Sequence, residues 1–158
     1  MAVLETKKIG LGKLPQILPA QWLKIGNELI QLIRLDAQKG ISQDDSTPTF
    51  AEYSDWYGDF KMRGDPDPSG RTTDSQVDPP NLKYTGEMLR KIYARNPRKD
   101  GITIQYEEGE RVLENIRMSN RNIFDVNSKN MNWIANEVVK IFDENAKKLK
   151  DLKLKIGK

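Results

Sequence analysis

Residues 20–38 read AQWLKIGNELIQLIRLDAQ, a pattern typical of an amphipathic α-helix. The apolar residues in and beside this stretch recur at spacings of three and four: Leu18, Trp22, Ile25, Leu29 and Leu32, with Ile17, Ile30, Ile33 and Leu35 widening the stripe. Pro15 and Pro19 mark the beginning of the helix and Gly40 marks its end. Because the stripe is broad, we expect one side to pack on a sheet and the remainder to face a partner subunit.

A β-hairpin is predicted in the second half of the chain. Residues 92–95 (IYAR) and 102–106 (ITIQY) have the short, alternating character of strands. Residues 96–101 (NPRKDG) separate them, and the Asp-Gly pair in this segment is a strong hairpin signal. The two strands therefore predict a small antiparallel sheet.

Further helices are predicted on both sides of the hairpin. We expect a loop or short helix over residues 51–62, a short helix over 108–120, and a long final helix with Asn127 or Ser128 as its N-cap. The apolar stripe of the final helix contains Met131, Ile134, Val138, Ile141, Phe142, Leu149 and Leu152.

Together these elements predict one α+β domain over residues 1–158, with a long N-terminal helix, an extended loop, a small antiparallel β-sheet and a C-terminal amphipathic helix. We expect an N-terminal arm (1–13), a partly mobile loop (41–80) and a basic C-terminal tail (146–158). The helices should lie on one face of the sheet. The predicted core contains Leu29, Leu32, Met88, Leu89, Ile104, Ile134, Val138 and Ile141.

The 158 residues include no cysteine and no histidine. This composition excludes disulfides, thiol nucleophiles, Cys/His zinc sites and His-dependent catalytic triads. We therefore expect a protein that is not an enzyme and that uses neither a cofactor nor a metal. No apolar run approaches the roughly 20 residues that span a bilayer, and residues 1–12 lack the apolar region of a signal peptide. We expect no contact with membranes and a cytoplasmic site of synthesis.

Charge is distributed unevenly along the chain. Residues 1–42 carry six Lys/Arg and three Asp/Glu, whereas residues 43–82 carry three Lys/Arg and nine Asp/Glu. Residues 83–158 carry 17 Lys/Arg and 11 Asp/Glu, and the tail 146–158 holds six Lys and one Asp. A basic tail suits nucleic acid or an acidic protein face, and lysines at a helix C-terminus also suit the helix dipole.

Aromatic residues gather in the irregular region 41–82, which also holds five of the eight prolines. Within eleven positions stand Phe50, Tyr53, Trp56, Tyr57 and Phe60. Stacking on single-stranded bases is one use of such a group, but the interleaved acids Glu52, Asp55 and Asp59 repel phosphates. Core packing or a protein contact is the better interpretation. The candidate subunit or partner interface is Phe50, Tyr53, Trp56 and Tyr57.

Three short motifs suggest chemistry, and in each the simpler structural interpretation is preferred. Residues 10–13 (GLGK) lack the spacing of a phosphate loop. Residues 65–70 (DPDPSG) open like a calcium loop, but Gln76 stands where a bidentate Glu is needed. Residues 107–110 contain three glutamates, which form a solvated turn more readily than an acid/base pair.

Three segments, in order, carry a resemblance to one family of proteins. Residues 39–42 and 50–61 (FAEYSDWYGDFK) are similar to a Phe-x-x-Tyr-Ser-x-x-Tyr-x-x-x-Lys stretch. Residues 80–92 (PNLKYTGEMLRKI) resemble a Leu-x-x-Thr-Gly-x-Met/Leu-x-x-Ser-Ile signature, and 121–126 (RNIFDV) an Arg-x-Ile/Phe-Phe-Gly-Leu segment. In this order the three segments resemble the head–tail-joining or tail-completion proteins of tailed phages, including the Mu-type virion morphogenesis family.

The resemblance covers residues 14–150 and departs from the family pattern at Lys91, which replaces Ser, at Asp125, which replaces Gly, and at 111–119, which replace a Tyr-Ala segment. It implies a structural virion protein of the phage neck, assembled in the host cytoplasm. The implied assembly is a ring of six or twelve copies around the DNA channel between portal and tail. Implied partners are other neck proteins, the portal or adaptor, and the tail tube or terminator.

DNA in such a lumen would be contacted without sequence readout. The candidate lumen-facing basic residues are Arg90, Lys91, Arg95, Arg117 and Arg121. The alternative hypothesis is a basic nucleic-acid-binding accessory protein, based on the excess of Lys and Arg after residue 82.

Overall fold

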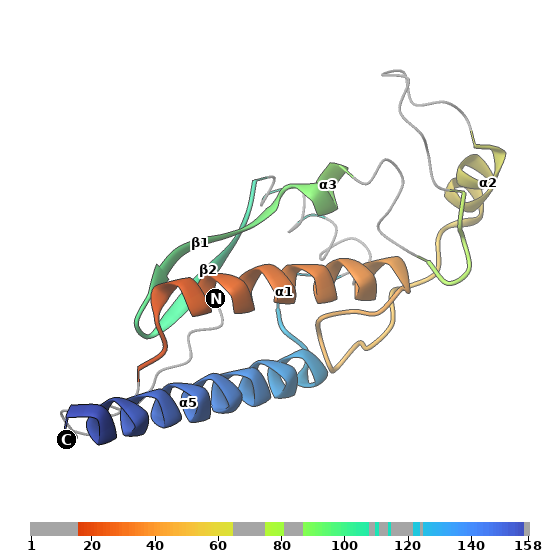
Figure 1. Ribbon diagram of the computed structural model, residues 1–158. Coiled ribbons are helices and arrows are strands. Elements are labelled where there is room, and N and C mark those ends of the chain that lie inside the picture. Colours follow the sequence, from red (N-terminus) through yellow and green to blue (C-terminus); the bar gives the residue numbers. More distant parts are fainter. Residues whose placement is uncertain are drawn as a thin grey trace.

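The computed structural model shows a mixed α+β fold (Figure 1). It describes residues 16–64, 75–80, 87–107, 110, 114, 122–123 and 125–156. In chain order the elements are helices α1 (Pro19–Gln38), α2 (Asp55–Arg63) and α3 (Glu87–Arg90), strands β1 (Ile92–Arg98) and β2 (Gly101–Tyr106), and helix α5 (Ser128–Ile156). The predicted N-terminal arm and most of residues 108–120 lie outside the described residues, although Glu110 and Glu114 are helical.

Helix α1 is the middle layer of the fold. The hairpin of β1 and β2 packs on one side of α1, and α5 runs along the other side (Figure 1). The two long helices lie on one face of the sheet, as the sequence predicts, with α1 against the strands and α5 behind α1. The hairpin approaches α1 closely at Gly26, where a Cβ atom would lie 2.9 Å from Cβ of Ala94 and from Cγ1 of Ile102. Glycine at this position therefore permits the contact between helix and sheet.

Strands β1 and β2 form the predicted antiparallel hairpin. Ile92 pairs with Tyr106 at one end and Arg98 pairs with Gly101 at the other, so the connecting turn contains only Lys99 and Asp100. The register shifts between Arg95 and Arg98. Strand β1 is longer than the predicted 92–95, because this irregularity lets the chain pass Pro97 without ending the pairing.

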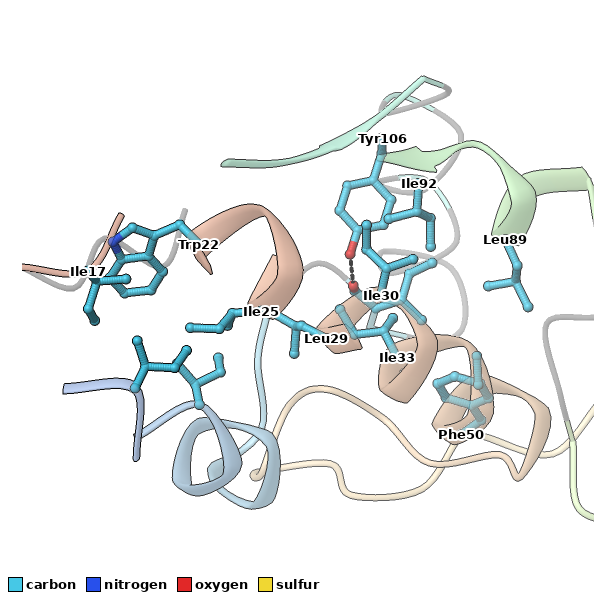
Figure 2. Packing of buried hydrophobic residues seen from close by; sticks show 14 residues of the cluster. Ile17, Trp22, Ile25, Leu29, Ile30, Ile33, Phe50, Leu89, Ile92 and Tyr106 are labelled. Carbon is cyan, nitrogen blue, oxygen red and sulfur yellow. Dashed lines mark hydrogen bonds between the residues drawn. The ribbon is translucent and has the colours of Figure 1, made fainter. Parts of the chain in front are cut away.

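The buried core lies between α1 and its two neighbours, as Figure 2 shows for the side chains drawn. The α1 side chains in it are Trp22, Ile25, Leu29, Ile30, Ile33 and Ala37, and Leu89, Ile92, Tyr106, Ile123, Ile134 and Ile141 complete it with Ile17 and Phe50. The Tyr106 hydroxyl donates a hydrogen bond to the carbonyl of Ile123 (Figure 2). Burial, followed by the nearby charge of Asp125, raises the pKa of Tyr106 well above its usual range.

The predicted core was mostly correct. Leu29, Leu89, Ile134 and Ile141 are buried, while Leu32, Ile104 and Val138 are half-buried. The side chain of Met88 lies outside the described residues. Two members of the predicted α1 stripe are in fact exposed, Leu18 (57%) and Leu35 (49%). Leu18 is the N-cap residue and precedes the helix, and Leu35 is two residues from Ile33, which places it on the opposite side of α1 from the buried residues.

Helix α5 begins as predicted at a capping asparagine. Asn127 Oδ1 accepts a hydrogen bond from the backbone N–H of Asn130 at 2.9 Å, which satisfies a donor in the first turn. The helix runs antiparallel to α1: Lys129 and Asn130 contact Asp36 near the end of α1, and Asn145 contacts Gln21 near its beginning. Among the described residues, no helix is long and apolar enough to cross a membrane.

Candidate functional site

Helix α2 carries an exposed aromatic surface at one end of the molecule (Figure 1). The Trp56 side chain is 74% exposed and its ring stacks on that of Phe60, with centroids 5.8 Å apart and planes 9° apart. Tyr53 and Tyr57 are half-buried, with ring centroids 5.0 Å apart. An indole exposed to this extent is unusual for a side chain with so much apolar area, and it marks a candidate contact surface.

Phe50 does not belong to this surface, so its assignment to the interface was wrong. It is only 4% exposed and packs in the central cluster (Figure 2). Its backbone N–H donates to the carbonyl of Gly40 at 2.8 Å, beside an isolated β-bridge between Ile41 and Thr49. These bonds hold the first part of the predicted loop against the end of α1 and direct Phe50 inward.

Helix α2 is held in place by Lys61, the last residue of the segment 50–61, for which the sequence predicted no structural role. Lys61 is fully buried, and its ammonium donates to the carbonyl of Gln76 at 2.6 Å and to the Tyr53 hydroxyl at 3.2 Å. The same ammonium lies 4.9 Å from the centroid of the Tyr53 ring. A buried charge of this kind needs such partners. The bond to Gln76 ties α2 to residues 75–80.

The side of α2 that faces away from Lys61 is both acidic and aromatic. Asp55, Trp56 and Asp59 are all exposed, and helical spacing places them side by side. Met62 is 55% exposed, and Arg63 is also exposed. We call Asp55, Trp56, Asp59 and Met62 the α2 tip.

The predicted basic group is only partly described. Arg90, at the end of α3, and Arg95, on β1, are exposed, whereas Lys91 is half-buried. Arg117 and Arg121 lie outside the described residues. The guanidinium of Arg95 lies 5.5 Å from the centroid of the Tyr93 ring. Arg90, Lys91 and Arg95 are therefore on the hairpin side of the fold.

Two exposed cations of the hairpin, Arg98 and Lys99, were not singled out by sequence. They stand at and beside the two-residue turn. The hairpin is in turn fixed to α1 by Arg34, whose guanidinium donates to the carbonyls of Leu89 at 2.8 Å and Arg90 at 3.2 Å. Arg34 thus satisfies carbonyls at the junction of α3 and β1.

A second basic surface is the end of α5. Asn145 donates to the carbonyl of Gln16 and exchanges hydrogen bonds with Gln21, so it is level with the beginning of α1. Residues 146–156 continue the helix beyond that level by about 16 Å (Figure 1). They include five Lys and one Asp. Lys147, Lys148 and Leu149 are exposed.

The end of α1 meets the beginning of α5 through a buried polar cluster that sequence reasoning missed. Asp36 is 3% exposed and accepts hydrogen bonds from Gln43 at 3.1 Å and Asn130 at 2.9 Å. The ammonium of Lys129 also donates a hydrogen bond to the Asp36 carboxylate, at 3.2 Å. Asn127 joins the cluster by donating to the carbonyl of Ser42 at 3.1 Å. Through these hydrogen bonds the cluster connects Ser42 and Gln43 to the end of α1 and the beginning of α5.

The partners of Asp36 determine its titration. Burial raises the pKa of the carboxyl, but the hydrogen bonds from Gln43 and Asn130 and the charge of Lys129 outweigh burial, so the pKa lies below its ordinary value of 3.8. Because the pKa of Asp36 is lower in the folded state than in the unfolded state, its ionised form contributes its full stabilisation at pH values above 3.8. This stabilisation is lost as pH falls through the lower, folded-state pKa.

Stability measured against pH should reveal this carboxylate. We expect the free energy of unfolding of the wild type to exceed that of Asp36→Asn most at neutral pH, and the difference to shrink as pH falls below 3.8. Urea unfolding of both proteins between about pH 7 and about pH 2 measures the difference. A difference that stayed constant over this range would contradict a charged, hydrogen-bonded Asp36.

The described residues offer little that resembles an enclosed small-molecule site. A depression of about 450 Å³ lies on α1 and is lined by Ala20, Leu23, Lys24, Asn27, Glu28 and Gln31. All of these residues come from one helix, so the described chain supplies a single wall, whereas ligand sites are usually concave and drawn from several elements. Within the same residues, no group of three or more acidic side chains is placed to hold a metal ion.

Of the three weaker motifs, only the glutamate group lies partly within the described residues. Residues 10–13 and 65–70 lie outside the described residues. Glu107 and Glu110 are exposed, as a solvated turn requires, and Glu108 lies outside the described residues. Comparison of the chain with family models, curated proteins and solved structures finds no match.

Proposed function

We propose that this chain is a structural subunit of a phage neck, which assembles with copies of itself into a ring around the DNA channel between portal and tail. The observation that carries the proposal is the exposed α2 tip, where Trp56 is 74% exposed on a helix at the end of the fold. A rigid aromatic anchor of this kind suits a protein partner, because Trp is enriched among the residues that dominate interface energies.

The sequence resemblance supports the same proposal independently. The resemblance implies a long helix, a loop, a hairpin and a final helix in that order, and α1, the hairpin of β1 and β2, and α5 follow one another in this order along the chain. The second segment contributes α3 and the beginning of β1, and the third immediately precedes α5. In this function the α2 tip contacts a neighbouring protein, and Arg90 and Arg95 face the DNA without reading its sequence.

The test of this function is quantitative mass spectrometry of purified phage particles. We expect the protein to be present at a fixed, low copy number, about six or twelve per particle, as the family resemblance implies for a closed ring. Particles made without the gene should contain heads and tails that do not join. A plasmid copy of the wild-type gene should restore joining, which controls for effects on neighbouring genes. Infectious particles that lack the protein would overturn the proposal.

A nucleic-acid-binding accessory protein is the second candidate. The specific observation in its favour is the group of exposed cations on the hairpin side: Arg90, Arg95, Arg98 and Lys99. Their contacts with phosphates would weaken steeply with salt. Binding of a short duplex should then fall by at least about tenfold between about 50 and 200 mM salt. Absence of binding at the lower salt concentration would remove this candidate.

A further inference from the structure

We infer that the α2 tip of one copy docks on the basic end of α5 in a second copy. The α2 tip is defined above, and the basic end of α5 is residues 146–156. The inference names the interface of the proposed ring, and it rests on that proposed function in taking a second copy of the chain as the occupant. It gives the two ends of the fold one common role.

Charge complementarity argues for this pairing. The exposed acids Asp55 and Asp59 flank the indole of Trp56 on one face of α2. The end of α5 presents the exposed cations Lys147 and Lys148 beside Leu149, whose side chain is 43% exposed. Each surface thus combines apolar area with an excess of one charge, because the two acids of the tip outnumber the exposed Arg63 and the five Lys of residues 146–156 outnumber one Asp. Lysine ammonium groups also favour the faces of indole rings.

The geometry of the fold makes the contact intermolecular. The α2 tip stands beyond the end of α1, whereas residues 146–156 extend past its beginning (Figure 1). Helix α1 alone separates the two by about 30 Å. The two surfaces cannot meet within one chain, but copies arranged head to tail bring them together.

Head-to-tail contact has a defined consequence for assembly. Two different patches meet in such a contact, so each copy retains one free tip and one free helix end. Copies therefore add in series, and they form a closed ring when the rotation between neighbours closes. The α2 tip is held by the buried Lys61 and its bond to Gln76, so the contact surface is positioned before binding.

Nucleic acid is the competing occupant for the basic end of α5. That assignment leaves the α2 tip without a role, because Asp55 and Asp59 repel phosphates. A second copy of the chain satisfies both surfaces with one interface. Nucleic acid is therefore an outcome of the experiment below and not part of the inference.

The experiment uses charge-reversed full-length chains in analytical ultracentrifugation. One variant carries Asp55→Lys with Asp59→Lys, and the other carries Lys147→Glu, Lys148→Glu and Lys150→Glu, because three reversals are needed to change the net charge of residues 146–156 from positive to negative. We expect the wild type to associate between about 10 µM and 1 mM, and less at high salt, as mass action and screening require. Each variant alone should associate at least about tenfold more weakly, because its tip and its helix end carry charges of the same sign.

The decisive sample is an equimolar mixture of the two variants. The first variant has a basic tip and a basic helix end, and the second has an acidic tip and an acidic helix end. Every contact between unlike variants therefore joins opposite charges, and we expect the mixture to recover association in alternating order. Misfolding of either variant cannot produce this recovery.

Matched controls exclude indirect effects. Glu107→Lys with Glu114→Lys makes the same change in net charge as the Asp55/Asp59 variant, at two exposed positions outside both surfaces, and it should leave association unchanged. Trp56→Ala should weaken association without altering the melting temperature, since the indole is 74% exposed. Equal loss in the Glu107/Glu114 control would overturn the inference.

Other outcomes are equally clear. A wild type that stays monomeric at every concentration, or a mixture that fails to recover, would overturn the inference. Binding of a short duplex to the end of α5 by a monomeric wild type would assign that end to nucleic acid instead. A monomer in solution that is still present in particles at ring-like copy number would leave the neck function standing. Head-to-tail association without presence in particles would leave the interface standing and overturn the neck function.

Discussion

Ile33→Ala is expected to lower the free energy of unfolding by about 2–5 kcal/mol. The Ile33 side chain is 1% exposed and lies in α1, in the cluster shared with the hairpin and α5 (Figure 2). Truncation removes buried methylene and methyl groups and leaves a cavity in the layer on which both neighbours pack. Urea unfolding followed by circular dichroism measures the change.

Leu35→Ala is the matched control for Ile33→Ala. Both residues belong to the apolar stripe that the sequence predicts, but Leu35 is 49% exposed. Its replacement should change the free energy of unfolding by no more than about 0.5 kcal/mol. Equal losses in the two variants would mean that the buried face of α1 has been assigned incorrectly.

Asp36→Ala is the second substitution with a large expected effect, a loss of about 2–4 kcal/mol. The carboxylate accepts hydrogen bonds from two side chains that are themselves buried, Gln43 (1% exposed) and Asn130 (0%). Without it, the Gln43 amide keeps a buried donor that water cannot reach. The same urea experiment at neutral pH measures the loss.

Lys129→Ala separates the buried hydrogen bonds from the ion pair. The Lys129 side chain is 69% exposed, so its bond to Asp36 is screened by solvent. Its removal should cost no more than about 1 kcal/mol. If Lys129→Ala were as destabilising as Asp36→Ala, the charge pair and not the buried amide contacts would hold the two long helices together.

Elements with strong local patterns were predicted well from the sequence. The three-and-four spacing of α1 and α5 and the Asp-Gly turn of the hairpin all correspond to observed elements. Their boundaries differ by a few residues at most, apart from β1. The reason is that helical and strand periodicity acts over short distances and is written directly into neighbouring residues.

The candidate site was less predictable because its residues are positioned by distant partners. In the sequence, Phe50 is one of five clustered aromatic residues. Its backbone hydrogen bond to Gly40, beside the bridge between Ile41 and Thr49, directs its side chain into the core. Lys61 has the sequence signature of a surface lysine, yet it is buried against Tyr53 and Gln76. No local pattern encodes either contact.

Sequence alone therefore predicted the α+β class, the long helices and the hairpin, since these depend on periodic burial and turn residues. The tertiary structure decided which members of the predicted α1 stripe are exposed and how Asp36 is satisfied. It also placed the α2 tip and the basic end of α5 at opposite ends of the molecule. These features depend on contacts between residues that are distant in the chain, such as Lys61 with Gln76 and Asp36 with Asn130. The burial, the hydrogen-bond partners and the surface position of these side chains are established only when the hairpin, α1 and α5 pack together.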